Sequence, residues 1–258
     1  MPDATSIVPI CRAAELVRLR ARVRRLEQGG RGEAETLSLG LPELDAALPE
    51  GGLALGAVHE LVAADAADGA VFGLAAHWLG MAQRREAGKW VLWCGRTERL
   101  YAPGLRLAGL DPARLVTARA HRDEDALWVL EEALRCRDLA GAVAEIDRLG
   151  LAQSRRLQLA AEAGGIGFLL RRPGAANEEG LGASAAVTRW RIAALPSAAG
   201  PAPGVLGPPR WRLELLRCRG GRPASWIVEG EDDAPGGFAL AAAIRDGSPW
   251  PAGAQAQG

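Results

Sequence analysis

Short apolar runs alternate with longer helical patterns through the middle of this sequence, and this alternation constrains the fold more than any other feature. Each apolar run is long enough for one strand, and about 10–15 residues with helical periodicity separate most of them. Such alternation is typical of βαβ units, which build a parallel sheet with helices on its faces. We therefore expect an α/β fold. The expected strands are 57–62, 90–94, 114–118, 142–146 and 166–170, and the expected helices are 70–87, 123–139 and 153–163.

The C-terminal part follows a different pattern. Strand-like runs at 187–195, 210–217 and 225–228 have no helices between them, which predicts antiparallel hairpins along one edge of a mostly parallel, twisted sheet. Two spacers, 173–186 and 196–209, are rich in Gly, Ala and Pro, and we expect them to be mobile. The main domain is expected to span residues 33–248, followed by a disordered tail at 249–258.

Residues 1–32 are expected to form a separate N-terminal segment. Residues 11–28 have the periodicity of an amphipathic helix, and the glycines that follow predict a flexible hinge. Six arginines occupy the other faces of this helix. Two interpretations are open: a solvated helix face, which is usual for runs of charge, or a helix that docks on a partner protein. The apolar residues of the docking interpretation are Leu16, Leu19, Val23 and Leu26.

The turn between the first long strand and the first long helix lies where a nucleotide-binding protein has its phosphate loop. It consists of Ala63, Ala64, Asp65, Ala66, Ala67, Asp68 and Gly69. A working loop needs several glycines, a Lys for the phosphates and a Ser or Thr for Mg²⁺. This turn has one glycine, lacks the other side chains, and carries two aspartates that would repel a triphosphate. We therefore expect no catalytic residues, no nucleotide cofactor and no ATPase activity, although a helix N-terminus can hold an anion weakly.

Charge and cysteine content exclude several other classes. The 31 basic and 31 acidic residues balance, so the whole chain is not a polycation suited to nucleic acid. The four cysteines are far apart without a CxxC pair, and the three histidines lack ligand spacing, which argues against a metal site or a disulfide scaffold. No apolar run approaches the about 20 residues of a membrane span, and no signal peptide is recognisable. We expect a soluble, cytoplasmic protein without membrane contact.

The order of these segments resembles the RecA-like ATPase core. The similarity lies in Gly-Leu-Pro-Glu-Leu-Asp at 40–45, Glu-Gly-Gly-Leu at 50–53, and the segment 94–111 after the second long strand. RecA-like enzymes keep a water-activating glutamate in that segment, whereas Thr97 stands at the corresponding place here, with Glu98 one residue later. Glu145 or Asp147 ends the expected strand 142–146, where an active ATPase would hold water or Mg²⁺. Without a phosphate loop, this carboxylate is expected to be structural.

Within that superfamily the chain resembles the ImuA family more closely, from about residue 37 to residue 228. The similarity lies in 156–165, 167–171 and 211–223, with Trp190 expected in an edge strand. This resemblance implies a non-catalytic adaptor in SOS-induced, error-prone translesion DNA synthesis. The partners it implies are RecA, a catalytically inactive Y-family-polymerase-like protein and, through the complex, a polymerase III α-subunit-like polymerase. The alternative is a divergent RecA-type ATPase acting on single-stranded DNA.

Two surfaces are candidates for contact with these partners. One is the N-terminal helix, and the other is an exposed hairpin turn with Arg217, Arg219 and Arg222. In residues 211–215 the alternation places Trp211, Leu213 and Leu215 on the core face. Residues 173–186, which correspond to a DNA-contacting loop of recombinases, hold two glutamates and no basic residue. Contact with single-stranded DNA is therefore expected to be weak or indirect.

Overall fold

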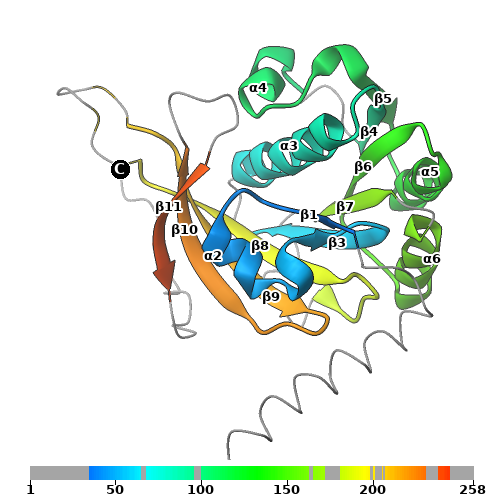
Figure 1. Ribbon diagram of the computed structural model, residues 1–258. Helices are drawn as coiled ribbons and strands as arrows, with labels where there is room; N and C mark the ends of the chain where they lie inside the picture. Colours follow the sequence, from blue (N-terminus) through cyan, green and yellow to red (C-terminus); the bar gives the residue numbers. More distant parts are fainter. Residues whose placement is uncertain are drawn as a thin grey trace, which may run out of the picture. The chain divides into compact units, whose positions relative to one another are not determined.

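The computed structural model describes residues 35–64, 68–95, 100–162, 165–171, 181–197, 200, 205, 207–230 and 238–244 (Figure 1). Contacts divide the chain into two units, Met1–Ala34 and Glu35–Gly258, and all described residues belong to the second unit. The predicted N-terminal helix with its hinge and the predicted disordered tail lie outside the described residues.

A nine-stranded mixed sheet forms the centre of the second unit, in the order β11-β10-β9-β8-β3-β7-β6-β4-β5. The six strands from β8 to β5 are parallel to one another, and β9, β10 and β11 continue the sheet in antiparallel fashion. The expected α/β class, with antiparallel C-terminal strands, is confirmed. The strands are β3 (Ala57–Ala63), β4 (Trp90–Gly95), β5 (Leu115–Arg119), β6 (Leu139–Ile146), β7 (Ile166–Arg171), β8 (Thr188–Leu195), β9 (Arg210–Cys218), β10 (Ala224–Gly230) and β11 (Phe238–Ile244).

Helices cover both faces of the parallel strands (Figure 1). Helix α3 (Asp68–Arg85) packs on one face, while α5 (Asp123–Arg135) and α6 (Leu151–Ala161) pack on the other. The strands are buried on both sides, so Leu61 of β3 joins the cluster under α3 and Val58 joins the cluster under α5 and α6. The smaller elements are β1 (Thr36–Leu37), α2 (Pro42–Ala47), η1 (Pro49–Gly51), β2 (Leu53–Ala54), α4 (Ala102–Leu107) and η3 (Pro112–Arg114).

Aromatic side chains join the parallel and antiparallel parts into one core on the α3 face. The ring of Trp78 from α3 lies 6.0 Å from Phe168 of β7 and 5.3 Å from Trp190 of β8. Trp190 in turn lies 5.9 Å from Trp226 of β10. The antiparallel strands therefore share a hydrophobic core with the βαβ units.

Two expectations about this part of the chain were wrong, and one strand was not predicted. Helix α5 ends at Arg135 instead of residue 139, because Leu139 begins a strand that is buried between β7 and β4. Trp190 does not lie in an edge strand: β8 is flanked by β3 and β9, and the Trp190 side chain is fully buried. Strand β11 was not predicted, since four of its seven residues are alanine, which is depleted in strands.

Candidate functional site

Open α/β sheets bind ligands at the carboxyl ends of their parallel strands, so a ligand site in this fold is expected at that edge. The structure places the predicted turn at this edge, between the end of β3 and the start of α3 at Asp68. Ala63 is buried in β3, and the amide of Ala64 donates a hydrogen bond to the carbonyl of Ile192 at 2.8 Å. Asp65, Ala66 and Ala67 lie outside the described residues, as do Thr97 and Glu98.

At the same edge, the strand-end carboxylate of Glu145 is engaged inside the protein. The indole N–H of Trp93, on β4, donates a hydrogen bond of 2.9 Å to Oε1 of Glu145, and both side chains are buried. The ring of Phe72, from the first turns of α3, stacks on Trp93 at 5.7 Å with an interplanar angle of 18°. A neutral indole is thus the hydrogen-bond donor to this strand-end carboxylate.

The backbone of β4 also approaches Glu145 closely. A Cβ atom added to Gly95, the last residue of β4, would lie 2.5 Å from Cδ of Glu145. On the opposite face, burial and the nearby carboxylates of Glu145 and Asp125 raise the pKa of the Cys94 thiol to about 11. Cys94 therefore stays protonated at neutral pH and is a poor nucleophile.

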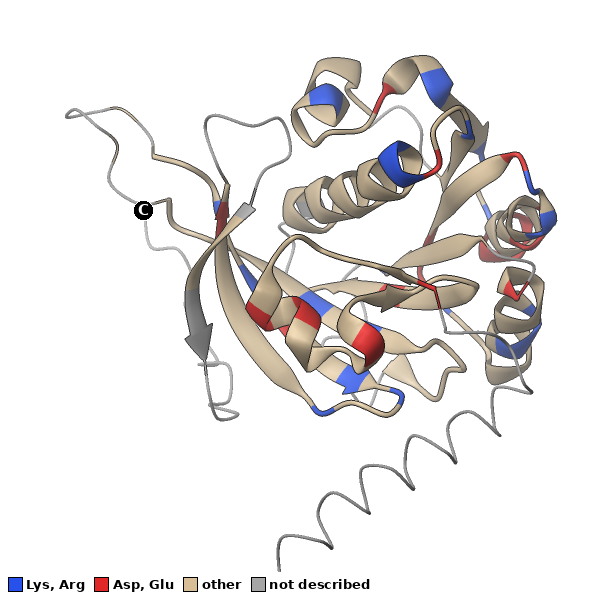
Figure 2. Cartoon of the chain, in the orientation of Figure 1, with Lys and Arg blue, Asp and Glu red and all other residues tan. Residues whose placement is uncertain are grey.

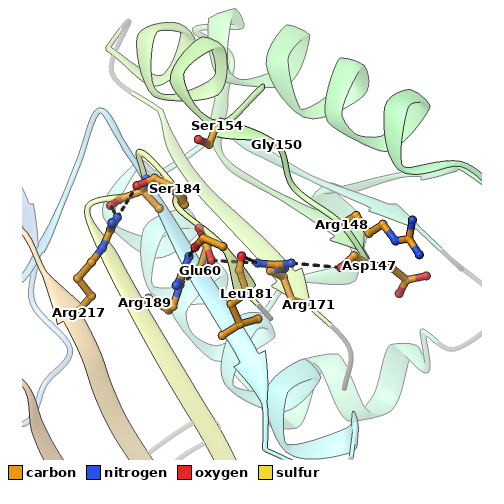
Figure 3. A network of polar contacts seen from close by, with 12 residues as sticks. Glu60, Asp147, Arg148, Gly150, Ser154, Arg171, Leu181, Ser184, Arg189 and Arg217 are labelled. Atoms are coloured by element: carbon orange, nitrogen blue, oxygen red, sulfur yellow. Dashed lines mark hydrogen bonds and ion pairs between the residues drawn. The ribbon is translucent and has the colours of Figure 1, made fainter. Parts of the chain in front are cut away.

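A second polar cluster lies under the α6 face of the sheet, around Glu60 in the middle of β3 (Figure 3). The carboxylate of Glu60 is fully buried, and its Oε2 lies 2.9 Å from Nε of Arg189 on β8 and 3.7 Å from the guanidinium of Arg171 on β7. Burial lowers the pKa of Arg171, and the charge of Arg189 acts in the same direction. Two guanidinium groups therefore neutralise one carboxylate in the interior.

Both arginines also bind the chain segment that precedes β8. Arg171 donates to the carbonyl of Leu181 at 2.8 Å, and Arg189 donates to the carbonyl of Gly182 at 2.9 Å. Arg171 further donates to the carbonyl of Asp147 at 3.3 Å. All of these contacts of Arg171 are made within the protein.

Two arginines of the predicted contact turn hold the same segment. Arg217 donates to the carbonyls of Ser184 and Ala186, and Arg219 donates to the carbonyl of Ala185 at 3.0 Å. These hydrogen bonds connect residues 181–186 to the sheet, while residues 173–180 of the same spacer lie outside the described residues. We call Arg171, Arg189, Arg217 and Arg219 the arginine cluster.

Arg222 differs from the other arginines of the turn. It is exposed between β9 and β10, and it makes no hydrogen bond or ion pair with any residue in the described ranges. Leu213 and Leu215 face the core as expected, and the partly buried Trp211 packs against it. Partner binding through the turn stays a prediction, as does docking through Leu16, Leu19, Val23 and Leu26, which lie outside the described residues.

Sequence reasoning missed the partners of these buried charges. A glutamate inside the apolar run 57–63 is itself a signal, because a buried carboxylate requires a cation or several donors. The arginines at alternate positions of the run 188–195 were candidate cations to neutralise this carboxylate. The register between β3 and β8, which sets Glu60 opposite Arg189, joins residues far apart in sequence.

No group of three or more His, Cys, Asp or Glu side chains in the described ranges could hold a metal ion. None of the described helices is long and apolar enough to cross a membrane.

Comparison with known proteins gives two relatives. No protein-family model matches the chain. Proteins named ImuA from two strains of Caulobacter vibrioides are each 41% identical to this chain over 233 residues. The similarity covers 86% of this chain and 95% of each relative, so it extends over nearly the whole length of those proteins.

Proposed function

The chain belongs to the ImuA family, and on that premise we propose that it is a non-catalytic adaptor with a RecA-like core in damage-inducible, error-prone translesion DNA synthesis. Its proposed partners are RecA, a catalytically inactive Y-family-polymerase-like protein, or both. A polymerase III α-subunit-like polymerase would join through the complex, and contact with single-stranded DNA would be weak or indirect.

The observation that carries this proposal is the state of the strand-end carboxylate. In a phosphoryl-transfer site, such a group would face water or a metal ion beside the phosphate loop. Here Glu145 accepts a hydrogen bond from Trp93 in the interior, and the turn after β3 offers neither a Lys nor a Ser or Thr. Both features lower the affinity for Mg²⁺ and triphosphate, and they support a scaffold role.

The arginine cluster supports the expectation of weak DNA contact. An arginine that tracks a nucleic acid backbone must present its guanidinium to phosphates. Arg171 is buried beside Glu60, and Arg217 and Arg219 are engaged with backbone carbonyls. Any phosphate contact through these side chains would require breaking bonds that hold residues 181–186.

An association measurement tests the adaptor role. Purified RecA and the Y-family-polymerase-like partner are each immobilised, and binding of the full-length chain is compared with binding of a form lacking residues 1–32 and of Arg222→Glu. We expect the full-length chain to bind at least one partner and at least one variant to bind more weakly. Arg155→Glu, an exposed charge reversal on α6, is the matched control and should bind like the unaltered chain. Failure of the full-length chain to bind either partner would overturn the proposal.

A further inference from the structure

A pocket of about 270 Å³ lies at the amino end of the parallel strands, opposite the edge that holds Glu145. Its lining comes from the last turn of α3, the end of α5, and the residues that open β6 or precede β3, β4 and β7. We call its apolar lining residues the floor: Leu55, Ala82, Leu134, Leu139 and Ala140.

The charged side chains around this floor are mostly basic. Arg85, Lys89, Arg135 and Arg137 line the pocket together with a single acid, Glu86. Basic residues close the last turn of α3 (Figure 2). Lys89 is the chain's only lysine. An apolar floor with a basic border suits a ligand that has an apolar body and a negative charge.

Two of these cations are available to a ligand. Arg85 is engaged with Glu35 and with the carbonyl of Thr36, and Arg135 is engaged with Glu131 and Glu132. Among the described residues, Lys89 contacts only the carboxylate of Glu86, at 3.0 Å. Its ammonium group has three N–H donors, so donors remain for a ligand.

Arg137 is the second cation available to a ligand. This exposed residue makes no hydrogen bond or ion pair with any described residue. Its five N–H donors can bind both oxygens of a planar anion.

The position of the pocket selects the kind of anion. It lies at the C-terminal ends of α3 and α5, where the helix backbone presents carbonyl groups and a partial negative charge. Phosphate groups favour the N–H groups of helix N-termini instead. A monoanion held by two side chains fits this position better than a phosphate dianion.

The volume limits the size of the ligand. Pockets for drug-sized molecules measure about 300–1,000 Å³, so about 270 Å³ suits a short apolar body. We propose that this pocket binds a carboxylate carried on a short apolar body, with Lys89 and Arg137 holding the carboxylate. Such a group occurs at the carboxyl terminus of a peptide and in free short-chain acids. This site is independent of the proposed adaptor role.

The thiol of Cys136 provides a direct probe, because this exposed cysteine lines the pocket beside Arg137. Alkylation by anionic iodoacetate is compared with alkylation by neutral iodoacetamide, and modification of Cys136 is followed by peptide mass spectrometry. A unit positive charge about 6 Å from the thiol in water raises the rate of its reaction with an anionic reagent roughly threefold. Relative to the uncharged reference thiol N-acetylcysteine amide, Cys136 should therefore favour iodoacetate about threefold.

Substitutions identify the cations responsible. Lys89→Gln and Arg137→Gln should each reduce the preference for iodoacetate, while Arg155→Gln, an equally exposed loss of charge outside the pocket, should leave it unchanged. Far-UV circular dichroism should be the same for all variants. A preference equal to that of N-acetylcysteine amide, or one that the two pocket variants keep in full, would overturn the proposal.

Competition defines the ligand. Hexanoate and N-acetyl-leucine should slow the reaction of Cys136 with iodoacetamide in the unaltered protein, and hexanamide should not. Tighter protection by N-acetyl-leucine assigns a peptide terminus, and tighter protection by hexanoate assigns a free acid. Equal protection by hexanamide, stronger protection by hexyl phosphate than by hexanoate, or no protection by either carboxylate contradicts the carboxylate site.

Discussion

The indole N–H of Trp93 on β4 donates a 2.9 Å hydrogen bond to the buried carboxylate of Glu145, which lies two residues beyond the register partner of Trp93 on the neighbouring parallel strand β6. The pair lies at the strand ends, beside the turn that would have to bind a triphosphate. Because the phosphate-binding side chains are missing and the carboxylate is engaged internally, this edge of the sheet now contributes to the core.

Removing the indole donor should destabilise the protein. In Trp93→Phe, the buried carboxylate of Glu145 loses a hydrogen bond, which costs about 1–3 kcal/mol, in addition to the cost of the smaller ring. Urea denaturation measures the free energy of unfolding. Trp90→Phe, on the same strand but about half exposed, is the matched control and should change stability by less than about 0.5 kcal/mol. Equal effects of the two substitutions would contradict the role of the Trp93–Glu145 pair.

The buried charges around Glu60 should be strongly coupled. Glu60→Gln leaves two guanidinium groups without their counter-charge in the interior, and loss of one partner of a buried ion pair costs about 3–5 kcal/mol. Glu132→Gln removes one carboxylate from an exposed ion pair with Arg135 and should cost less than about 1 kcal/mol. Chemical denaturation measures the free energy of unfolding of both variants. A loss at Glu60 no larger than that at Glu132 would show that the buried pairing is absent in solution.

Stability should fall in mild acid because of two buried histidines. Burial lowers the pKa of His59 and of His77 from 6.5 to about 4. The unfolded chain therefore takes up these protons at higher pH than the folded chain. Stability is fully present above pH 6.5 and is lost as the pH falls from 6.5 towards 4.

Replacement of His59 isolates its share of this loss. A change in pKa from 6.5 to about 4 corresponds to roughly 3 kcal/mol. Between pH 7 and pH 4, the unaltered protein should therefore lose up to about that much more stability than His59→Gln. His121→Gln, at an exposed position, should keep the original pH profile. Parallel profiles for His59→Gln and the unaltered protein would be inconsistent with a neutral, buried His59.

Loss of one arginine from the cluster should loosen the segment before β8. Arg217→Gln removes donors to the carbonyls of Ser184 and Ala186, and the loss of about 1 kcal/mol should speed local amide exchange roughly fivefold. The amide of Ala185, which donates to Ser154 Oγ at 3.0 Å, is a suitable reporter. Hydrogen exchange followed by mass spectrometry measures the change, and Arg222→Gln should leave it unaffected. Unchanged exchange in Arg217→Gln would indicate that other contacts hold the segment.

Most strands and long helices could be predicted from the sequence because their signals are local. The apolar run that became β4 and the acidic first turn of α5 each mark an element without reference to the rest of the chain. The site depends instead on contacts between distant residues. Trp93 meets Glu145 across 52 positions and Arg189 meets Glu60 across 129, and neither pairing can be deduced without the strand register. For the same reason Trp190 was wrongly predicted to lie in an edge strand, because the position of β8 beside β3 follows from packing.

Titration with ATP and Mg²⁺ tests the central claim most directly. The melting temperature and the release of phosphate are followed with and without single-stranded DNA, and purified RecA serves as the positive control. We predict no ATP-dependent shift in melting temperature and no phosphate release above background, because the turn after β3 offers no cation or metal ligand and Glu145 is held by Trp93. A magnesium-dependent rise of several degrees, or phosphate release stimulated by single-stranded DNA, would contradict this account and identify the chain as a divergent ATPase.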